Sequence, residues 1–167
     1  MKIYTSLNRI HKLKPLNGDW AALRHHLGKR KADDKPLDML TVLRLTGLDG
    51  FLIYSQAAVD HWRAHRLLSI EFQRSGLRLP EDQWLAAELD VLERCAYAAG
   101  SDEEFISISG ATNEPALAAL SRARWEMSNM PNAEEVFTQI AERFLAKGSG
   151  PVLIWDRDQQ AVSKKAA

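Results

Sequence analysis

Two histidines come closest to a catalytic or metal-binding motif in this sequence of 167 residues. His61 and His65 are four residues apart, so on a helix both imidazoles would lie on one face, as paired zinc ligands do. A zinc protease helix would carry glutamate directly after the first histidine, whereas Trp62 stands there, and no third ligand can be named. A metal-dependent hydrolase that uses His61 and His65 therefore stays an alternative function, and we expect neither a metal nor another cofactor.

The remaining reactive side chains lack the neighbours that catalysis needs. Cys95 precedes Ala96 on the apolar side of the longest expected helix, where burial keeps a thiol protonated. No GxSxG turn accompanies the serines, and the GLDG segment (47–50) lacks the lysine that follows a phosphate-binding loop. We therefore expect a protein that is not an enzyme.

Glycine and proline divide the chain into helix-sized pieces. Most pieces begin with a residue that caps helix N-termini and end with glycine or a proline-containing turn. The expected helices start at Asn17 or Asp19, Pro36, Asp49, Asp60, Pro80, Ser101, Asn113 and Asn132. The apolar run FLIY (51–54) also fits a strand, but its place after a capping aspartate favours a helix.

These pieces predict an all-α fold, a single-domain bundle of about seven to eight helices over residues 1–160 with a flexible tail at 161–167. A composition of 46% hydrophobic and 26% charged residues fits one domain with an ordinary core. The run PVLIWD (151–156) is short, apolar and partly β-branched, so it fits a strand that would pair with the N-terminal KIYTSL (2–7).

The overall charge argues against two classes of partner. Lys and Arg number 22, as do Asp and Glu, and a net charge of zero gives no general attraction to nucleic acid or to an anionic membrane. No apolar run approaches the ~18 residues that span a bilayer, and the N-terminus lacks an apolar stretch of signal-peptide length. We therefore expect a cytoplasmic protein with no membrane partner, and nucleic acid is an unlikely one.

The charges are nevertheless segregated along the sequence. Residues 1–35 hold nine basic and three acidic residues, a balance of +6, whereas residues 81–114 hold nine acidic residues and one basic, a balance of −8. If the two segments lie apart in space, each can attract a partner of opposite charge, and if they pack together they neutralise each other. The basic N-terminal third leaves a nucleic-acid-binding regulator as a second alternative.

The candidate binding residues combine carboxylates of the acidic segment with one aromatic side chain. Most of the five tryptophans are expected in the core, but Trp125 has polar neighbours and can be exposed as an interface anchor. The predicted partner-binding residues are Glu81, Asp82, Asp102, Glu103, Glu104 and Trp125.

One stretch, Trp20 to Phe51, has a more specific pattern, LGKxxADDxPLxxLTxLxxxGLD. It resembles the all-helical immunity proteins encoded beside polymorphic toxins in bacteria, which have a tryptophan, the GK-x-x-ADD-x-PL loop and a leucine-rich helix ending in a GLD turn. HRLLSIEF (65–72) and EEVFTQIAERFL (134–145) are similar to later helices of that family. The chain departs from it at GFLIYS (50–55), where the family continues with an Ala-Leu-Trp helix.

The residues that carry the resemblance are of types that end helices, cap them or pack between them. The resemblance therefore implies binding without catalysis: a small cytoplasmic protein that occludes the active site of a cognate toxin. The acidic segment would suit a basic nuclease toxin, because carboxylates mimic phosphate and accelerate association with a cationic surface.

Overall fold

Eight α-helices, one 3-10 helix and a two-stranded sheet form the part of the chain that the computed structural model describes, which is residues 1–146 without 16, 79, 111–112, 127 and 130–131. The all-α class is thereby confirmed. In chain order the elements are β1 (Tyr4–Thr5), α1 (Leu7–Lys12), α2 (Asn17–His26), β2 (Leu37–Asp38), α3 (Met39–Tyr54), η1 (Ser55–His61), α4 (Trp62–Ser75), α5 (Gln83–Ala98), α6 (Asp102–Ser109), α7 (Ala116–Glu126) and α8 (Ala133–Ala146).

The small sheet joins the N-terminus to the start of α3. β1 pairs antiparallel with β2, and Tyr4 lies opposite Asp38. The expected partner at 151–156 and the expected tail at 161–167 lie outside the described residues. Because Leu37 belongs to a strand, the prediction that Pro36 opens the helix is wrong; Asp38 caps α3 instead, and its Oδ1 accepts a hydrogen bond from the Leu40 amide at 2.9 Å.

Helix α3 is broken where the sequence predicts a helix end. Gly47 has φ 70° and ψ −175°, a conformation that is essentially restricted to glycine, and the helix resumes at Leu48. The run 51–54 is helical, as expected, and Phe51 is fully buried. Gly50 lies so close to Thr46 that a Cβ there would be 2.3 Å from the threonine Oγ1.

Two further helix starts differ from the prediction. Asp60 does not cap α4, which begins after the 3-10 turn η1; its carboxylate lies 2.5 Å from Arg9 Nη1 in an ion pair with α1. Pro80 does not begin α5 either, because Pro80 lies in a turn and accepts a hydrogen bond from the Gln83 amide. In both places a turn occupies the residues at which the sequence pattern predicts the start of the helix.

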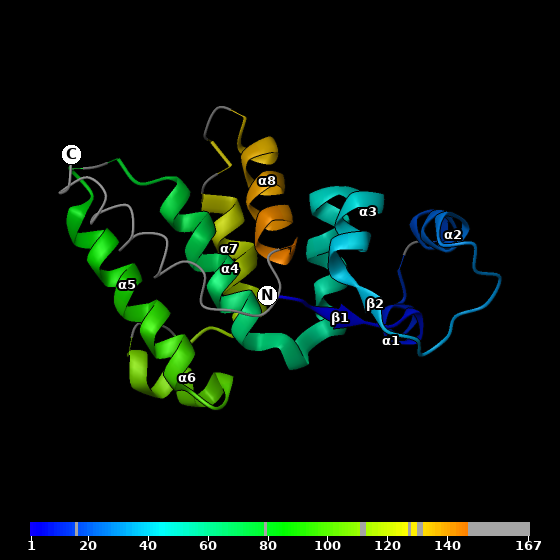
Figure 1. Ribbon diagram of the computed structural model, residues 1–167, viewed down its shortest axis with the longest axis horizontal. Helices are drawn as coiled ribbons and strands as arrows, with labels where there is room; N and C mark the ends of the chain where they lie inside the picture. Colours follow the sequence, from blue (N-terminus) through cyan, green and yellow to red (C-terminus); the bar gives the residue numbers. More distant parts are fainter. Residues whose placement is uncertain (16, 79, 111–112, 127, 130–131, 147–167) are drawn as a thin grey trace, which may run out of the picture.

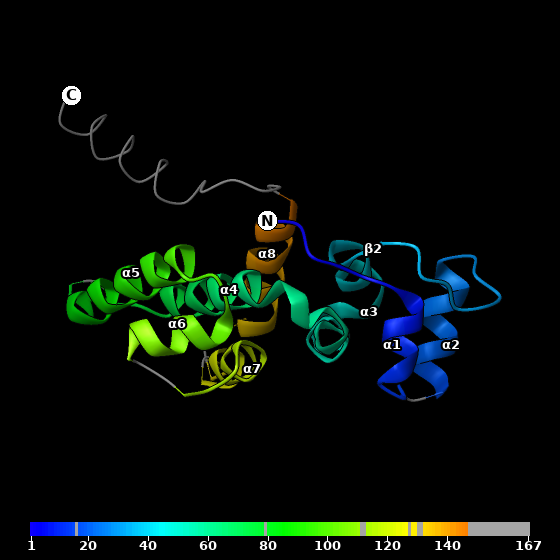
Figure 2. The same ribbon diagram turned by 90° about the horizontal axis from the view of Figure 1, so that it is seen from below.

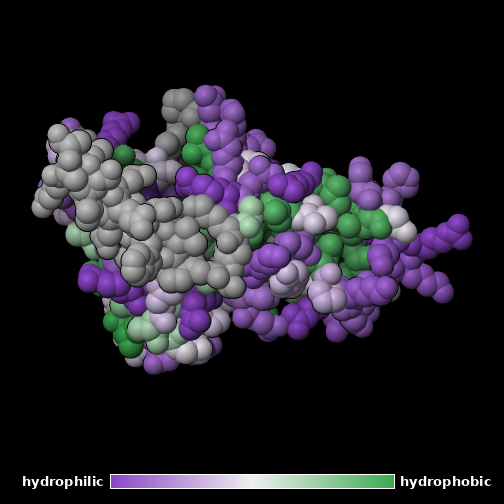
Figure 3. Space-filling model, in the orientation of Figure 1, coloured by the Kyte–Doolittle hydropathy of each residue, from purple (hydrophilic) through white to green (hydrophobic). Residues whose placement is uncertain are grey.

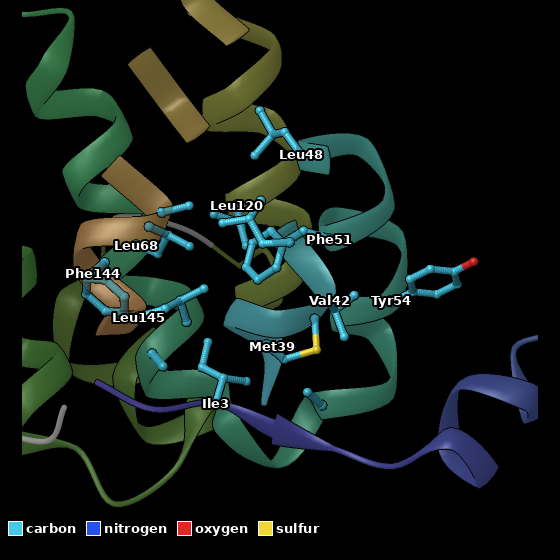
Figure 4. Close-up of a cluster of buried hydrophobic side chains, with 14 of the residues drawn as sticks. Ile3, Met39, Val42, Leu48, Phe51, Tyr54, Leu68, Leu120, Phe144 and Leu145 are labelled. Atoms are coloured by element: carbon cyan, nitrogen blue, oxygen red, sulfur yellow. The ribbon is translucent and has the colours of Figure 1, made fainter. Parts of the chain in front are cut away.

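The core lies between α3, α4, α7 and α8 (Figure 4). Apolar side chains from all four helices meet there, and Ile3, the residue before β1, closes the cluster. Its labelled members are Ile3, Met39, Val42, Leu48, Phe51, Tyr54, Leu68, Leu120, Phe144 and Leu145. Along the long axis, α1 and α2 form one end of the molecule and α5 and α6 the other (Figures 1 and 2). Within the described ranges, no helix combines the length and the apolar character needed to cross a bilayer.

Candidate partner-binding surface

The two charged segments lie at opposite ends of the molecule. The basic residues 1–35 include α1 and α2, whereas the acidic residues 81–114 include α5 and α6, and both views place these helix pairs far apart along the long axis (Figures 1 and 2). The sequence left open whether the segments neutralise each other. Their separation in space means that they do not.

Part of the acidic charge is instead neutralised by arginines of α4. Arg74 Nη1 lies 2.9 Å from Glu71 Oε1, and its Nη2 lies 2.6 Å from Asp90 Oδ1 and 2.5 Å from Glu93 Oε2. Burial by itself would lower the pKa of the Arg74 guanidinium, but its hydrogen bonds to Glu93 and Glu71 outweigh burial and raise it. Glu93 is buried in this network.

A second arginine of α4 holds Asp102 inside the protein. Arg66 Nε lies 2.8 Å from Asp102 Oδ1, and these side chains are only 3% and 18% exposed. The other carboxylate oxygen of Asp102 accepts a hydrogen bond from the Ala116 amide at 2.9 Å, so Asp102 rather than Asn113 satisfies the start of α7. Asp102 thus makes internal contacts with both oxygens.

A third arginine binds the end of α5. Arg63 Nε donates to the Ala96 carbonyl at 2.9 Å and Nη2 donates to the Ala99 carbonyl at 2.5 Å. Because Arg63, Arg66 and Arg74 are three and eight residues apart in turn, they share one side of α4. The charge-assisted hydrogen bonds of these arginines attach α5 and α6 to the bundle. The charge totals of residues 1–35 and 81–114 give no indication of these bonds.

The other predicted acidic residues differ in whether their carboxylates have hydrogen-bond or ion-pair partners. Glu81 and Glu103 are exposed and have no hydrogen-bond or ion-pair partner in the described part of the chain. Asp82 accepts the Arg78 amide at 2.7 Å, and Glu104 accepts the Gly100 amide at 2.6 Å while its own amide donates to Ser101 Oγ. The capping role expected for Ser101 is therefore confirmed.

These carboxylates do not form one patch. Glu81 and Asp82 precede α5, and Glu103 and Glu104 follow it. A helix of 16 residues is about 24 Å long, so the two groups lie at opposite ends of α5. Their electrostatic fields can still attract a basic partner together, because an electrostatic field extends farther than a direct contact does.

Two of the tryptophans in the described part of the chain are strongly exposed. Trp125 on α7 is 73% exposed, as the sequence predicted, and Trp84 on α5 is 68% exposed, which it did not predict. The seven-residue spacing between Trp84 and Val91, also exposed, places both on one stripe of α5, away from the buried Leu89. The spacing by itself gives no signal of exposure, because two apolar residues seven apart fit a buried stripe equally well.

The two candidate metal ligands are differently engaged. His61 Nε2 accepts a hydrogen bond from the Tyr4 amide at 3.2 Å. His65 is fully buried, and neither of its ring nitrogens has a hydrogen-bond partner among the described residues. Burial, with repulsion from His61, lowers the pKa of His65 to about 4, although Asp102 acts in the opposite direction. Among the residues described, no three His, Cys, Asp or Glu side chains are grouped as a metal site would require.

Two of the grooves on the described part of the surface lie between helices. One, of about 560 Å³, lies between α2 and α3 and is walled by Ala22, Leu45 and Ile53; apolar side chains are grouped in that region in Figure 3. The other, of about 360 Å³, is bounded by α4, α5, α6 and α7, and we call it the α5–α7 groove. Its lining includes Asp82 and also Glu126, the neighbour of Trp125, so this groove connects the two parts of the predicted surface.

No protein-family model matches this chain, and comparison with curated proteins and with solved structures gives no match.

Proposed function

We propose that this protein is a non-catalytic, cytoplasmic binding module of the immunity type, which neutralises a cognate bacterial toxin by direct contact. The observation that carries the proposal is the exposure of Trp84 and Trp125 on helices that border one groove. Exposed tryptophan is costly in water and is enriched among the residues that dominate protein interfaces. The resemblance of residues 20–51 to immunity proteins supports the same class of partner.

The charge distribution supports a basic toxin. Glu81, Glu88 and Glu103 have no partner in the described residues, and they lie at the end of the molecule opposite the basic α1 and α2. A cationic protein surface would be attracted to this end and turned toward it before contact. Nucleases have such surfaces because they bind phosphates, so a nuclease is the toxin class we expect.

The test uses the product of the neighbouring gene. Co-expression with that product is expected to abolish its toxicity, and the two proteins should purify together. Trp84→Ala combined with Trp125→Ala should weaken the complex at least about tenfold, as loss of interface anchors does. The control Val59→Ala removes an exposed apolar side chain from η1 and should leave affinity unchanged. A neighbouring product that is toxic with or without this protein, and that does not bind it, would refute the proposal.

A further inference from the structure

The α5–α7 groove is formed by one face from each of three long helices. Residues that are three, four or seven apart share a helix face, and the groove-lining residues have this spacing. They are Arg66, Ser69, Ile70 and Gln73 on α4, Leu85, Glu88 and Leu92 on α5, and Ala119, Arg122 and Glu126 on α7. Since α5 packs on α4 and α6 while α7 packs on α4, the space between α5 and α7 stays open.

Apolar side chains form part of the groove lining, beside polar ones such as Ser69 and Gln73. Ile70 and Phe105 are buried beneath it, and Leu85 and Leu92 are only partly buried, so they present apolar surface to it. A volume of about 360 Å³ is near the lower limit of pockets that hold small ligands. The groove therefore has room for a few apolar side chains but not for a whole helix.

The rim is negatively charged. The two arginines that line the groove are already neutralised: the buried Arg66 pairs with Asp102, and Arg122 lies 2.8 Å from Glu114 and 2.9 Å from Glu126. Glu88 has no partner in the described chain, and Asp82 accepts only a neutral backbone amide. The uncompensated charge on the rim is therefore that of carboxylates.

We infer that the α5–α7 groove binds a segment of the partner protein in which apolar side chains are flanked by lysine or arginine. The apolar side chains would displace water from Leu85 and Leu92, and the cations would pair with Glu88 and Asp82 at the rim. This inference rests on the proposed function and adds to it the chemistry of the contacting segment and the place where it binds.

The first experiment tests the groove without the toxin. Two short amphipathic peptides with leucines at the same positions are compared. One has lysine at all remaining positions, and the other has glutamate there. The Leu/Lys peptide is expected to bind, to shift the methyl NMR signals of Ile70, Leu85 and Leu92, and to bind about tenfold more tightly than the Leu/Glu peptide. Absence of binding, or shifts confined to other methyl groups, would overturn the inference.

Three variants test whether the Leu/Lys peptide binds in the groove. Gln73→Trp places a large side chain in the groove, and Glu88→Lys reverses the charge of an exposed rim residue. Each should weaken binding of the Leu/Lys peptide about tenfold. The matched control Asp34→Lys makes the same charge change at an exposed position among the basic residues 1–35 and should have no such effect. If Gln73→Trp does not fold, Glu88→Lys and Asp34→Lys decide, and equal affinities for these two would overturn the inference.

The same variants separate this inference from the proposed function. If the neighbouring gene product binds wild type, Gln73→Trp and Glu88→Lys equally, the groove is not the contact and the inference is wrong, while the proposed function stands. If that product does not bind wild type at all, the proposed function fails, and the peptide measurements still decide whether the groove takes a basic, apolar segment.

Discussion

Arg66 in the middle of α4 and Asp102 at the first position of α6 form an ion pair that is almost closed to water. The distance from Arg66 Nε to Asp102 Oδ1 is 2.8 Å, and the guanidinium also lies 4.5 Å from the centre of the Phe105 ring. A buried ion pair contributes little net stability but is costly to break on one side. Asp102 therefore holds α4, α6 and the start of α7 together. This structural role distinguishes Asp102 from the exposed carboxylates next to it in the sequence.

Replacing Asp102 should destabilise the fold. Asp102→Ala leaves the Arg66 charge without its carboxylate and removes the acceptor of the Ala116 amide, so the free energy of unfolding should fall by about 3 kcal/mol. Glu103→Ala, one residue on and exposed, should change it by less than about 0.5 kcal/mol. Denaturant unfolding of both variants measures the difference, and similar losses would contradict the role given to Asp102.

Reversing the exposed carboxylates should slow binding rather than alter folding. Glu81→Lys with Glu103→Lys is expected to lower the association rate with the toxin at low salt, and the effect should shrink as salt screens the charges. Stopped-flow association at several salt concentrations measures this. An association rate equal to that of wild type at low salt would mean that the acidic end does not attract the partner.

His65 should make the protein less stable in acid. At pH above about 7 the imidazole is neutral in both folded and unfolded chains, so it adds no pH dependence. As pH falls from about 6.5 toward 4, the unfolded chain takes up a proton that the buried His65 does not, and up to about 3 kcal/mol of stability is lost. The free energy of unfolding, plotted against pH over this range, should fall more steeply for wild type than for His65→Leu. Parallel curves would show that His65 is not the group responsible.

Gly50 should tolerate no side chain. Gly50→Ala would put a Cβ 2.3 Å from Thr46 Oγ1 and 2.4 Å from Thr46 Cβ, and Thr46 is itself held by its hydrogen bond to the Val42 carbonyl. The crowding should cost about 1–3 kcal/mol, more than the gain in helix propensity.

The matched control is Gly18→Ala in α2, where the added Cβ has no described atom within 4 Å beyond its chain neighbours and the backbone of its own helix. This change should leave thermal stability equal or slightly higher, since alanine favours the helix. A Gly50→Ala protein that melts at the temperature of the control would contradict the close contact with Thr46.

The sequence by itself determined the helical class and several helix limits. Ser101 caps α6, Gly28 and Gly110 take positive φ after α2 and α6, and Gly47 breaks α3, because each of these depends on atoms within a few residues.

Only the tertiary structure decided what the charged and edge residues do. Asp102 and Glu93 are bound by arginines of α4, β1 pairs with β2, and Trp84 stays uncovered. Each outcome depends on which segments far apart in the sequence pack together, or on what that packing leaves open. Local pattern determines where a helix begins and ends, but the energy of a buried charge depends on the partner that packing brings to it.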